Sequence, residues 1–145
     1  MTADAILRGS CACGRVAYEI EGPLIGPLTY CHCWRCRKQS GSSFGTTAGV
    51  AAEDFRITAG ADVLRAWESS PGVLRHFAGC CGSPIFKTDA SDPEELGFRL
   101  GTLDDNPGLR GGMHLHAGSM VPWLAIADDL PSETGGPPFG ARVRP

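Results

Sequence analysis

The chain has 145 residues, with 13 Lys and Arg against 16 Asp and Glu, so its formal net charge is −3 with histidine neutral. A chain of this length predicts one domain with a modest core, because it can bury roughly two thirds of its unfolded surface. The slightly acidic balance argues against a nucleic-acid partner, since domains that bind nucleic acid are usually basic. Glycine (20) and proline (11) are frequent, which favours short strands joined by turns over long helices.

The start of the chain and its apolar segments bear on location. Residues 1–10 have no apolar stretch after a charged start, so we expect no secretory signal. No segment approaches the roughly 18 apolar residues that span a bilayer, so we expect no membrane partner. These features predict a cytoplasmic protein, in which the seven cysteines stay reduced. Clustered reduced cysteines bind metal or carry out redox chemistry more often than they form disulfides.

Alternating apolar residues and turn residues predict a series of strands. The clearest covers residues 15–21, where Val16, Tyr18 and Ile20 share one face. Further strands are expected at residues 46–51, 55–58, 63–68, 73–77, 83–88, 98–103, 113–117 and 123–127, and helical turns at residues 37–43 and 92–95. We expect a single zinc-binding β domain over residues 1–130 and a loosely ordered tail, rich in proline and glycine, over residues 131–145.

The strongest chemical signal is a C-x-C-x-x-C motif made by Cys31, Cys33 and Cys36. Three thiolates so close in sequence converge on one ion only if the backbone folds tightly around it, and zinc at about 2.3 Å from each sulfur suits that arrangement. A structural zinc site closes with a fourth protein ligand, whereas a catalytic site keeps that position for water or substrate. Spacing leaves both readings open; the candidates for a fourth ligand are a distant cysteine, His32, His76, His114 and His116.

A second set of cysteines consists of Cys11 and Cys13, before the first clear strand, and Cys80 and Cys81 far downstream. Two cysteine pairs so far apart in the sequence suit a structural zinc site, because closing a long loop removes much of the conformational freedom of the unfolded chain. Seven cysteines then divide into one closed site of four and one open site of three. Neighbouring side chains of an extended chain point to opposite faces, which makes Cys80 the weaker ligand candidate.

Several motifs occur in an order that resembles a known family. They are GSCACG at residues 9–14, YCHCWRCRK at 30–38 followed by SGS at 40–42, residues 77–84, GTLDD at 101–105, His114-Leu115, and Pro122-Trp123 before Asp128. Over nearly the whole chain they resemble the glutathione-dependent formaldehyde-activating (GFA) enzymes and the related centromere-protein-V-type domain. The resemblance implies a mainly β, zinc-bound fold of the small Mss-four-like (β-tent) type, built of short antiparallel strands with few or no long helices.

The same resemblance implies two zinc sites. Cys31, Cys33 and Cys36 would hold a catalytic zinc, and the outer cysteines Cys11, Cys13 and Cys81 would hold a structural zinc. The family pattern around the second cysteine pair is C-x-x-C-G, whereas here Ala78 replaces the first cysteine of that pattern. Either Cys80 takes its place through a bent turn, or the outer site is incomplete.

The activity implied by the resemblance is addition of the glutathione thiol to formaldehyde, formally a carbon-sulfur lyase running in reverse. The partners would be a small-molecule thiol and an aldehyde. Arg35, Arg37 and Lys38 place positive charge beside the three-cysteine motif and are candidates to receive glutathione carboxylates. His114 is a further candidate for substrate binding because it matches the family.

Two other classes of function fit the same sequence. A zinc-stabilised interaction module would have both cysteine sites closed and no pocket beside the C-x-C-x-x-C motif. A thiol-based reductase, resembling methionine-sulfoxide reductases, would need an exposed reactive cysteine outside the metal sites. Cys80 is the only candidate for that role.

Overall fold

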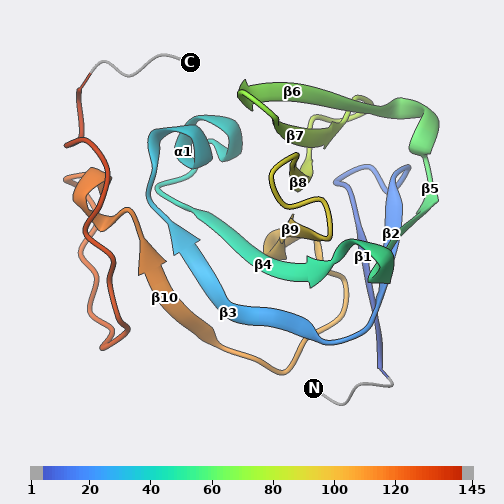
Figure 1. The fold of residues 1–145 in the computed structure, drawn as a ribbon, viewed down its shortest axis with the longest axis horizontal. Helices are drawn as coiled ribbons and strands as arrows, with labels where there is room; N and C mark the ends of the chain where they lie inside the picture. The colour runs from blue at the N-terminus through green and yellow to red at the C-terminus, as the bar shows by residue number, and fades with distance from the viewer. Residues whose placement is uncertain (1–4, 142–145) are drawn as a thin grey trace. The chain divides into compact units, whose positions relative to one another are not determined.

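The computed structural model describes residues 5–141, in which the regular elements are short strands and one α-helix. The chain divides into two compact units. Unit 1 comprises residues 1–26 and 48–109, and unit 2 comprises residues 27–47 and 110–145. Strands β3 (Leu24–Cys31) and β4 (Gly45–Ala51) belong partly to each (Figure 1). The mainly β class without long helices, predicted from the sequence, is confirmed for the described residues.

A three-stranded antiparallel sheet lies in unit 1. Its strands are β1 (Ile6–Ser10), β2 (Ala17–Glu21) and β5 (Phe55–Ala59), in the order β1-β2-β5. Tyr18 and Ile20 are buried, as the alternation predicts, and Tyr18 stacks on Phe55 with ring centroids 4.8 Å apart. Gly9 lies opposite Tyr18 in the register, and a Cβ at Gly9 would lie 2.2 Å from the tyrosine ring. The close approach of ring and backbone therefore requires glycine at this position.

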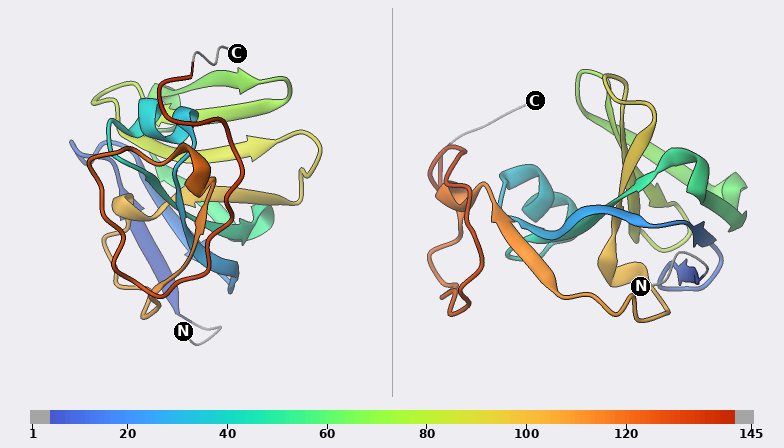
Figure 2. Two further views of the ribbon diagram at one scale, coloured as in Figure 1. Left: turned by 90° about the vertical axis from the view of Figure 1, so that its left-hand side faces the viewer. Right: turned by 60° about the horizontal axis from the view of Figure 1, so that its bottom comes forward.

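Unit 1 also contains a meander of antiparallel strands. The strands β6 (Leu64–Ser70), β7 (Val73–Ala78), β8 (Pro84–Asp89) and β9 (Glu95–Arg99) lie side by side, with the end of β4 next to β9 (Figure 2). Val50, Ile85 and Phe98 are fully buried core residues. β7 and β8, which correspond to the strands expected at residues 73–77 and 83–88, form a hairpin around the Cys80-Cys81-Gly82 corner.

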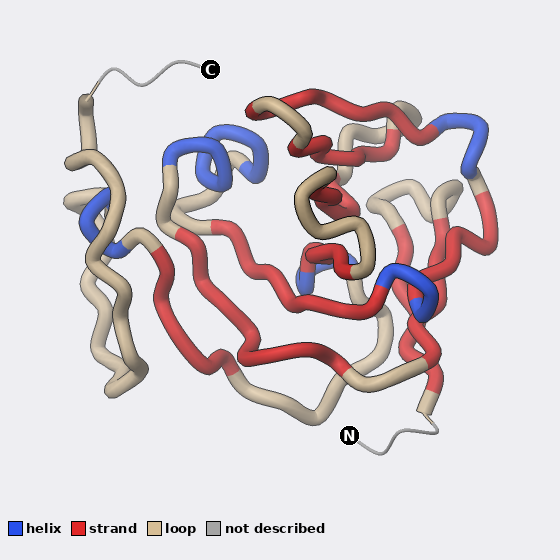
Figure 3. Tube along the Cα trace, viewed as in Figure 1, coloured by secondary structure: helices blue, strands red, loops and turns tan. Residues whose placement is uncertain are grey.

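Unit 2 contains α1 (Trp34–Ser40), which follows β3 almost directly, and β10 (Gly111–Leu115). β10 pairs with β3 in parallel, and β3 is followed by β4 in the strand order. The pairing is therefore mixed rather than purely antiparallel. Parallel neighbours need a long connection, which the chain between β3 and β10 supplies. After β10 the described chain runs mainly as a loop (Figure 3).

The helical predictions need two corrections. Residues 92–95 form a turn rather than a helical turn, and β9 begins at Glu95. The strand expected at 98–103 accordingly begins earlier, and a short 3-10 helix, Leu100–Thr102, follows it. The helix expected at 37–43 begins at Trp34, because the Cys33 sulfur caps it by accepting a hydrogen bond from the backbone N–H of Cys36 at 3.4 Å.

The strand predicted at residues 123–127 is wrong. These residues lie in irregular chain. Trp123 is 69% exposed, and its ring meets Phe139 edge-on instead of a neighbouring strand. An alternating pattern predicts a strand only if a partner supplies the ladder of hydrogen bonds. β1, in contrast, is a strand that the pattern did not indicate.

Candidate metal centres

Four cysteines of unit 1 form an outer group. The sulfur atoms of Cys11, Cys13, Cys80 and Cys81 all lie within 4.8 Å of one another. Within it, the Sγ atoms of Cys13 and Cys80 lie 3.3 Å apart. The group joins the segment after β1 to the turn between β7 and β8. A tetrad of thiols is a donor set that fits Zn²⁺.

The turn between β7 and β8 explains how two adjacent cysteines reach one group. Residues 79–81 are not extended, and the backbone N–H of Gly82 donates to the carbonyl of Ala78 at 2.7 Å. Gly82 adopts a left-handed conformation, with φ of 84°. The alternation that would separate the Cys80 and Cys81 side chains applies only to extended chain. The bent turn therefore brings the Cys80 sulfur into the group. The family pattern would instead have a cysteine two positions earlier, where this chain has Ala78.

The surroundings shift the pKa values of three thiols in the outer group, and not all in the same direction. The hydroxyl and backbone of Ser83 lower the pKa of Cys81 to about 5. The neighbouring Cys13 sulfur raises the pKa of Cys80 to about 12. Burial opposes ionisation of Cys11, but the backbone N–H of Val16, 3.2 Å from its sulfur, helps bring its pKa below the ordinary value. Further thiolates in this small space require a cation to balance their charge.

Three cysteines of unit 2 form an inner group. The sulfur atoms of Cys31, Cys33 and Cys36 lie within 4.8 Å of one another, with Cys31 and Cys36 buried. Cys31 ends β3, Cys33 caps α1, and Cys36 lies in the first turn of α1. The contacts with Cys33 and Cys36 and burial raise the pKa of Cys31. Three ionised sulfurs at this site therefore also need a cation, and the all-sulfur donor set fits zinc.

The histidines proposed as a fourth ligand do not belong to the inner group. Among residues 5–141 that group contains cysteines alone. The ring of His32 is turned to His114, with 2.9 Å between His32 Nε2 and His114 Nδ1. His76 lies in unit 1, on β7, beside the hydroxyl of Thr88.

The His32–His114 pair continues to a carboxylate. His114 Nε2 lies 3.1 and 3.0 Å from the two carboxylate oxygens of Asp128. The hydrogen bond from His114 holds the pKa of Asp128 below its usual range, and burial lowers the pKa of His32. Both ring nitrogens of His114 thus have partners within unit 2, which favours a positioning role for this residue.

The basic residues named from the sequence all lie on α1. Arg35 and Arg37 are half-buried and Lys38 is exposed. The guanidinium of Arg35 lies 4.7 Å from the centre of the Trp34 ring. That of Arg37 lies 5.0 Å from the Phe139 ring, in the part of the chain expected to be a loosely ordered tail. The structure thus adds an aromatic contact to the face of α1 that carries Arg37.

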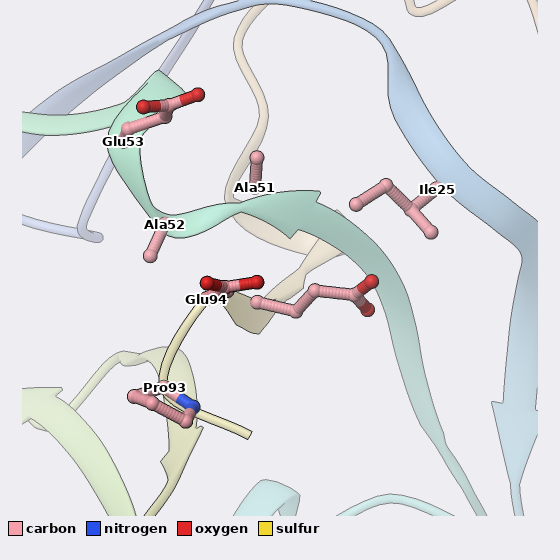
Figure 4. Close-up of a pocket in the computed structure, with 7 residues that line it drawn as sticks. Ile25, Ala51, Ala52, Glu53, Pro93 and Glu94 are labelled. Atoms are coloured by element: carbon pink, nitrogen blue, oxygen red, sulfur yellow. The ribbon is translucent and has the colours of Figure 1, made fainter.

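A cavity of about 520 Å³ lies elsewhere, in unit 1. It is lined where β4 ends and β9 begins, by Ile25, Ala51, Ala52, Glu53, Pro93, Glu94 and Glu95 (Figure 4). Its lining contains carboxylates but neither thiol nor imidazole. It therefore offers no soft metal ligands, and none of the residues that line it belongs to either cysteine group.

Comparisons with known proteins find a matching family, a relative of similar sequence and a solved structure of similar fold. The family described as "Glutathione-dependent formaldehyde-activating enzyme" matches residues 6–119. A protein of Halomonas elongata, whose name assigns it provisionally to that activity, is 29% identical over 129 residues, covering 83% of this chain and 81% of the relative. A crystal structure of a Rhodobacter sphaeroides protein matches with a TM-score of 0.58 and 26% identity, covering 70% of this chain and 92% of the other.

The chain belongs to the glutathione-dependent formaldehyde-activating enzyme family. The family match spans every cysteine of both groups, as well as His32 and His114. Asp128 lies beyond the matched range. The sequence offers no local signal for its pairing with His114, because the two residues are on different segments of unit 2 and no regular spacing relates them.

In the described part of the chain, no helix has the length and apolar character needed to cross a membrane.

Proposed function

We propose that this protein is a zinc-dependent carbon-sulfur lyase of the formaldehyde-activating type, which adds the thiol of glutathione to formaldehyde. The observation that carries the proposal is the inner group: three converging thiols at the motif that the family resemblance assigns to the reaction centre. Four thiols in the outer group suit a closed structural site. Three thiols leave one position of a four-coordinate metal for an external ligand.

In this proposal Cys31, Cys33 and Cys36 hold the catalytic zinc. When bound there, zinc supplies a fourth position that favours soft sulfur ligands and keeps a substrate thiol ionised near neutral pH. In the overall reaction the glutathione sulfur forms a bond to the carbon of formaldehyde. The carbonyl π pair moves to oxygen, which gains a proton, while the thiol loses one. The product is S-hydroxymethylglutathione.

Arg35, Arg37 and Lys38 are proposed to bind the carboxylates of glutathione. Charge-assisted hydrogen bonds from guanidinium groups to carboxylates are stronger than neutral ones. The aromatic rings beneath Arg35 and Arg37 favour defined positions for their cationic groups. These contacts would orient the tripeptide so that its thiol reaches the inner group.

The outer group is proposed to hold a structural zinc through Cys11, Cys13, Cys80 and Cys81. The metal would join two segments that are far apart in sequence and so would stabilise unit 1. Membership of this group also argues against a reductase, because Cys80 was the only candidate for a reactive cysteine outside the metal sites. Reduced thiols in both groups are consistent with a cytoplasmic location, which we also propose.

Binding of a thiol to the inner group can be tested by calorimetry. Zinc-loaded protein is titrated with glutathione in two buffers of different ionisation enthalpy. We expect binding with release of about one proton, because a thiol must ionise to coordinate a metal. S-methylglutathione, which has no thiol, should release none, and Cys33→Ser should abolish the glutathione signal.

Turnover is tested in parallel by exchange NMR between formaldehyde and S-hydroxymethylglutathione. The zinc-loaded protein should accelerate exchange above the rate in buffer, and the Cys33→Ser variant should not. A wild-type protein that gives neither proton release nor faster exchange would contradict the proposal. The interaction-module hypothesis would then replace it.

A further inference from the structure

A chain of hydrogen bonds inside unit 2 connects Asp128, His114 and His32, and the proposed reaction does not use it. The links are 3.0 Å from Asp128 Oδ2 to His114 Nε2 and 2.9 Å from His114 Nδ1 to His32 Nε2. The side chain of His114 is 4% exposed, His32 is fully buried, and the Asp128 side chain is 42% exposed. The chain of hydrogen bonds therefore begins at the surface of unit 2, at Asp128, and ends at the buried ring of His32.

When His114 is neutral, the carboxylate fixes the direction of both bonds in this chain of hydrogen bonds. An ionised carboxylate can only accept, so Nε2 of His114 must carry the proton that it donates to Asp128. A neutral His114 then presents Nδ1 as an acceptor, and Nε2 of His32 donates to it. Nδ1 of His32 is left without a proton. It is buried and has no hydrogen-bond partner among the described residues.

His32 lies between two cysteines of the inner group and is held at three points. Its backbone N–H donates to the carbonyl of Leu115, at the end of β10, at 2.9 Å. Its carbonyl accepts from Nε of Arg37, on α1, at 3.4 Å. Its ring is bonded to His114, on β10. A residue fixed in this way restricts the backbone on both sides of it, and so restricts where the sulfurs of Cys31 and Cys33 can lie.

We propose that Asp128 and His114 are positioning residues for the inner cysteine group: through one chain of hydrogen bonds they fix the ring orientation and tautomer of His32, and with it the segment that carries Cys31 and Cys33. This inference rests on the proposed metal site at the inner group. Removal of a group that orients the ligands of a metal site commonly lowers the metal affinity 10- to 100-fold. Asp128 supplies the direction of the chain, because an asparagine at that position could donate as well as accept.

The tautomers can be measured in the wild-type protein without any substitution. Long-range ¹H–¹⁵N correlation of the imidazole rings at pH 8, above the usual titration range of histidine near 6.5, distinguishes the two neutral forms. Both His114 and His32 should carry the proton on Nε2. A proton on Nδ1 of His32 would overturn the inference.

The coupling to the metal site is tested with Asp128→Asn and its matched control Asp129→Asn, which alters the neighbouring exposed residue. Protein loaded with ¹¹³Cd should give separate signals for the three-sulfur and four-sulfur groups. Asp128→Asn should shift the signal of the inner group and leave that of the outer group in place. It should also weaken metal binding at the inner group about 10-fold in competition with a chelator. Asp129→Asn should change neither.

A general loss of folding would move both cadmium signals, so the outer group serves as an internal control. Asp128→Glu, which keeps a carboxylate, should restore part of the metal affinity. Equal behaviour of the Asp128→Asn and Asp129→Asn variants would overturn the inference and leave the proposed function standing. Failure of the wild-type protein to bind glutathione would instead contradict the proposed function, while the tautomer and cadmium results would still decide the role of Asp128.

Discussion

Arg35 illustrates what a single side chain contributes at the inner group. It lies on α1 between two cysteines of the C-x-C-x-x-C motif, with its guanidinium over the Trp34 ring. The side chain is therefore close in sequence to the proposed metal ligands without being one. Its predicted task is to hold a substrate carboxylate, which affects binding in the ground state and the transition state alike.

Replacing Arg35 by glutamine should raise KM for glutathione about 10-fold and leave kcat nearly unchanged. A charge-assisted hydrogen bond contributes about 1.5–3 kcal/mol, and loss of uniform binding appears in KM. Arg110→Gln, at an exposed position of unit 2, is the matched control and should change neither parameter. Steady-state kinetics of the two variants decide the point; a fall in kcat alone would show that Arg35 does not act by binding substrate.

Gly82 is a second residue whose role is local. A Cβ added there meets no atom within 4 Å, but φ is 84°, a conformation that favours glycine. Gly82→Ala should therefore lower the free energy of unfolding by about 1–2 kcal/mol through backbone strain alone. Gly101→Ala also adds a methyl group in open space, but it does so without a left-handed φ, and should cost less. Denaturant unfolding of both variants tests this difference, and equal losses would contradict it.

At the scale of elements, the two cysteine groups join the chain in different ways. The inner group lies within one connection, from the end of β3 into α1. The outer group joins two segments that are distant in the sequence, since Cys13 and Cys80 are 67 positions apart. A metal that closes the longer loop removes more freedom from the unfolded chain.

Cys13→Ser should therefore destabilise the zinc-loaded protein more than Cys36→Ser does. Each variant removes one sulfur ligand, so the substitutions are chemically matched. Thermal melts at equal zinc concentration should show the larger fall in Tm for Cys13→Ser. Equal falls, or a larger fall for Cys36→Ser, would mean that the structural role belongs to the inner group.

Across the whole molecule, the seven cysteines divide into two candidate metal sites, of four and of three, without a remainder. Elemental analysis of the purified protein should find close to two equivalents of zinc per chain. The Cys36→Ser and Cys13→Ser variants should each retain about one, at the other group. Because zinc binding displaces protons from thiols, zinc content should fall as the pH is lowered. Protein that stays folded and active after complete removal of zinc would contradict both metal assignments.

The sequence by itself determined the class of fold and the presence of a group of converging thiols. Frequent glycine and proline, and the alternation at Val16, Tyr18 and Ile20, predict short strands from neighbouring residues alone. The C-x-C-x-x-C motif predicts a group of converging thiols for the same reason, because three sulfurs within six positions converge when one short segment bends. The resemblance to the GFA family also rests on local motifs, and the family match confirms it.

The tertiary structure alone decided which distant residues meet. The bent turn after β7 brought Cys80 into the outer group, whereas the extended geometry assumed from the sequence would have separated it from Cys81. β10 became a parallel neighbour of β3, and the expected strand at 123–127 found no partner. His32, His114 and Asp128 joined through bonds that no local spacing signals. Pairings of this kind depend on long-range contacts and on hydrogen-bond geometry, which form only when separate segments pack together.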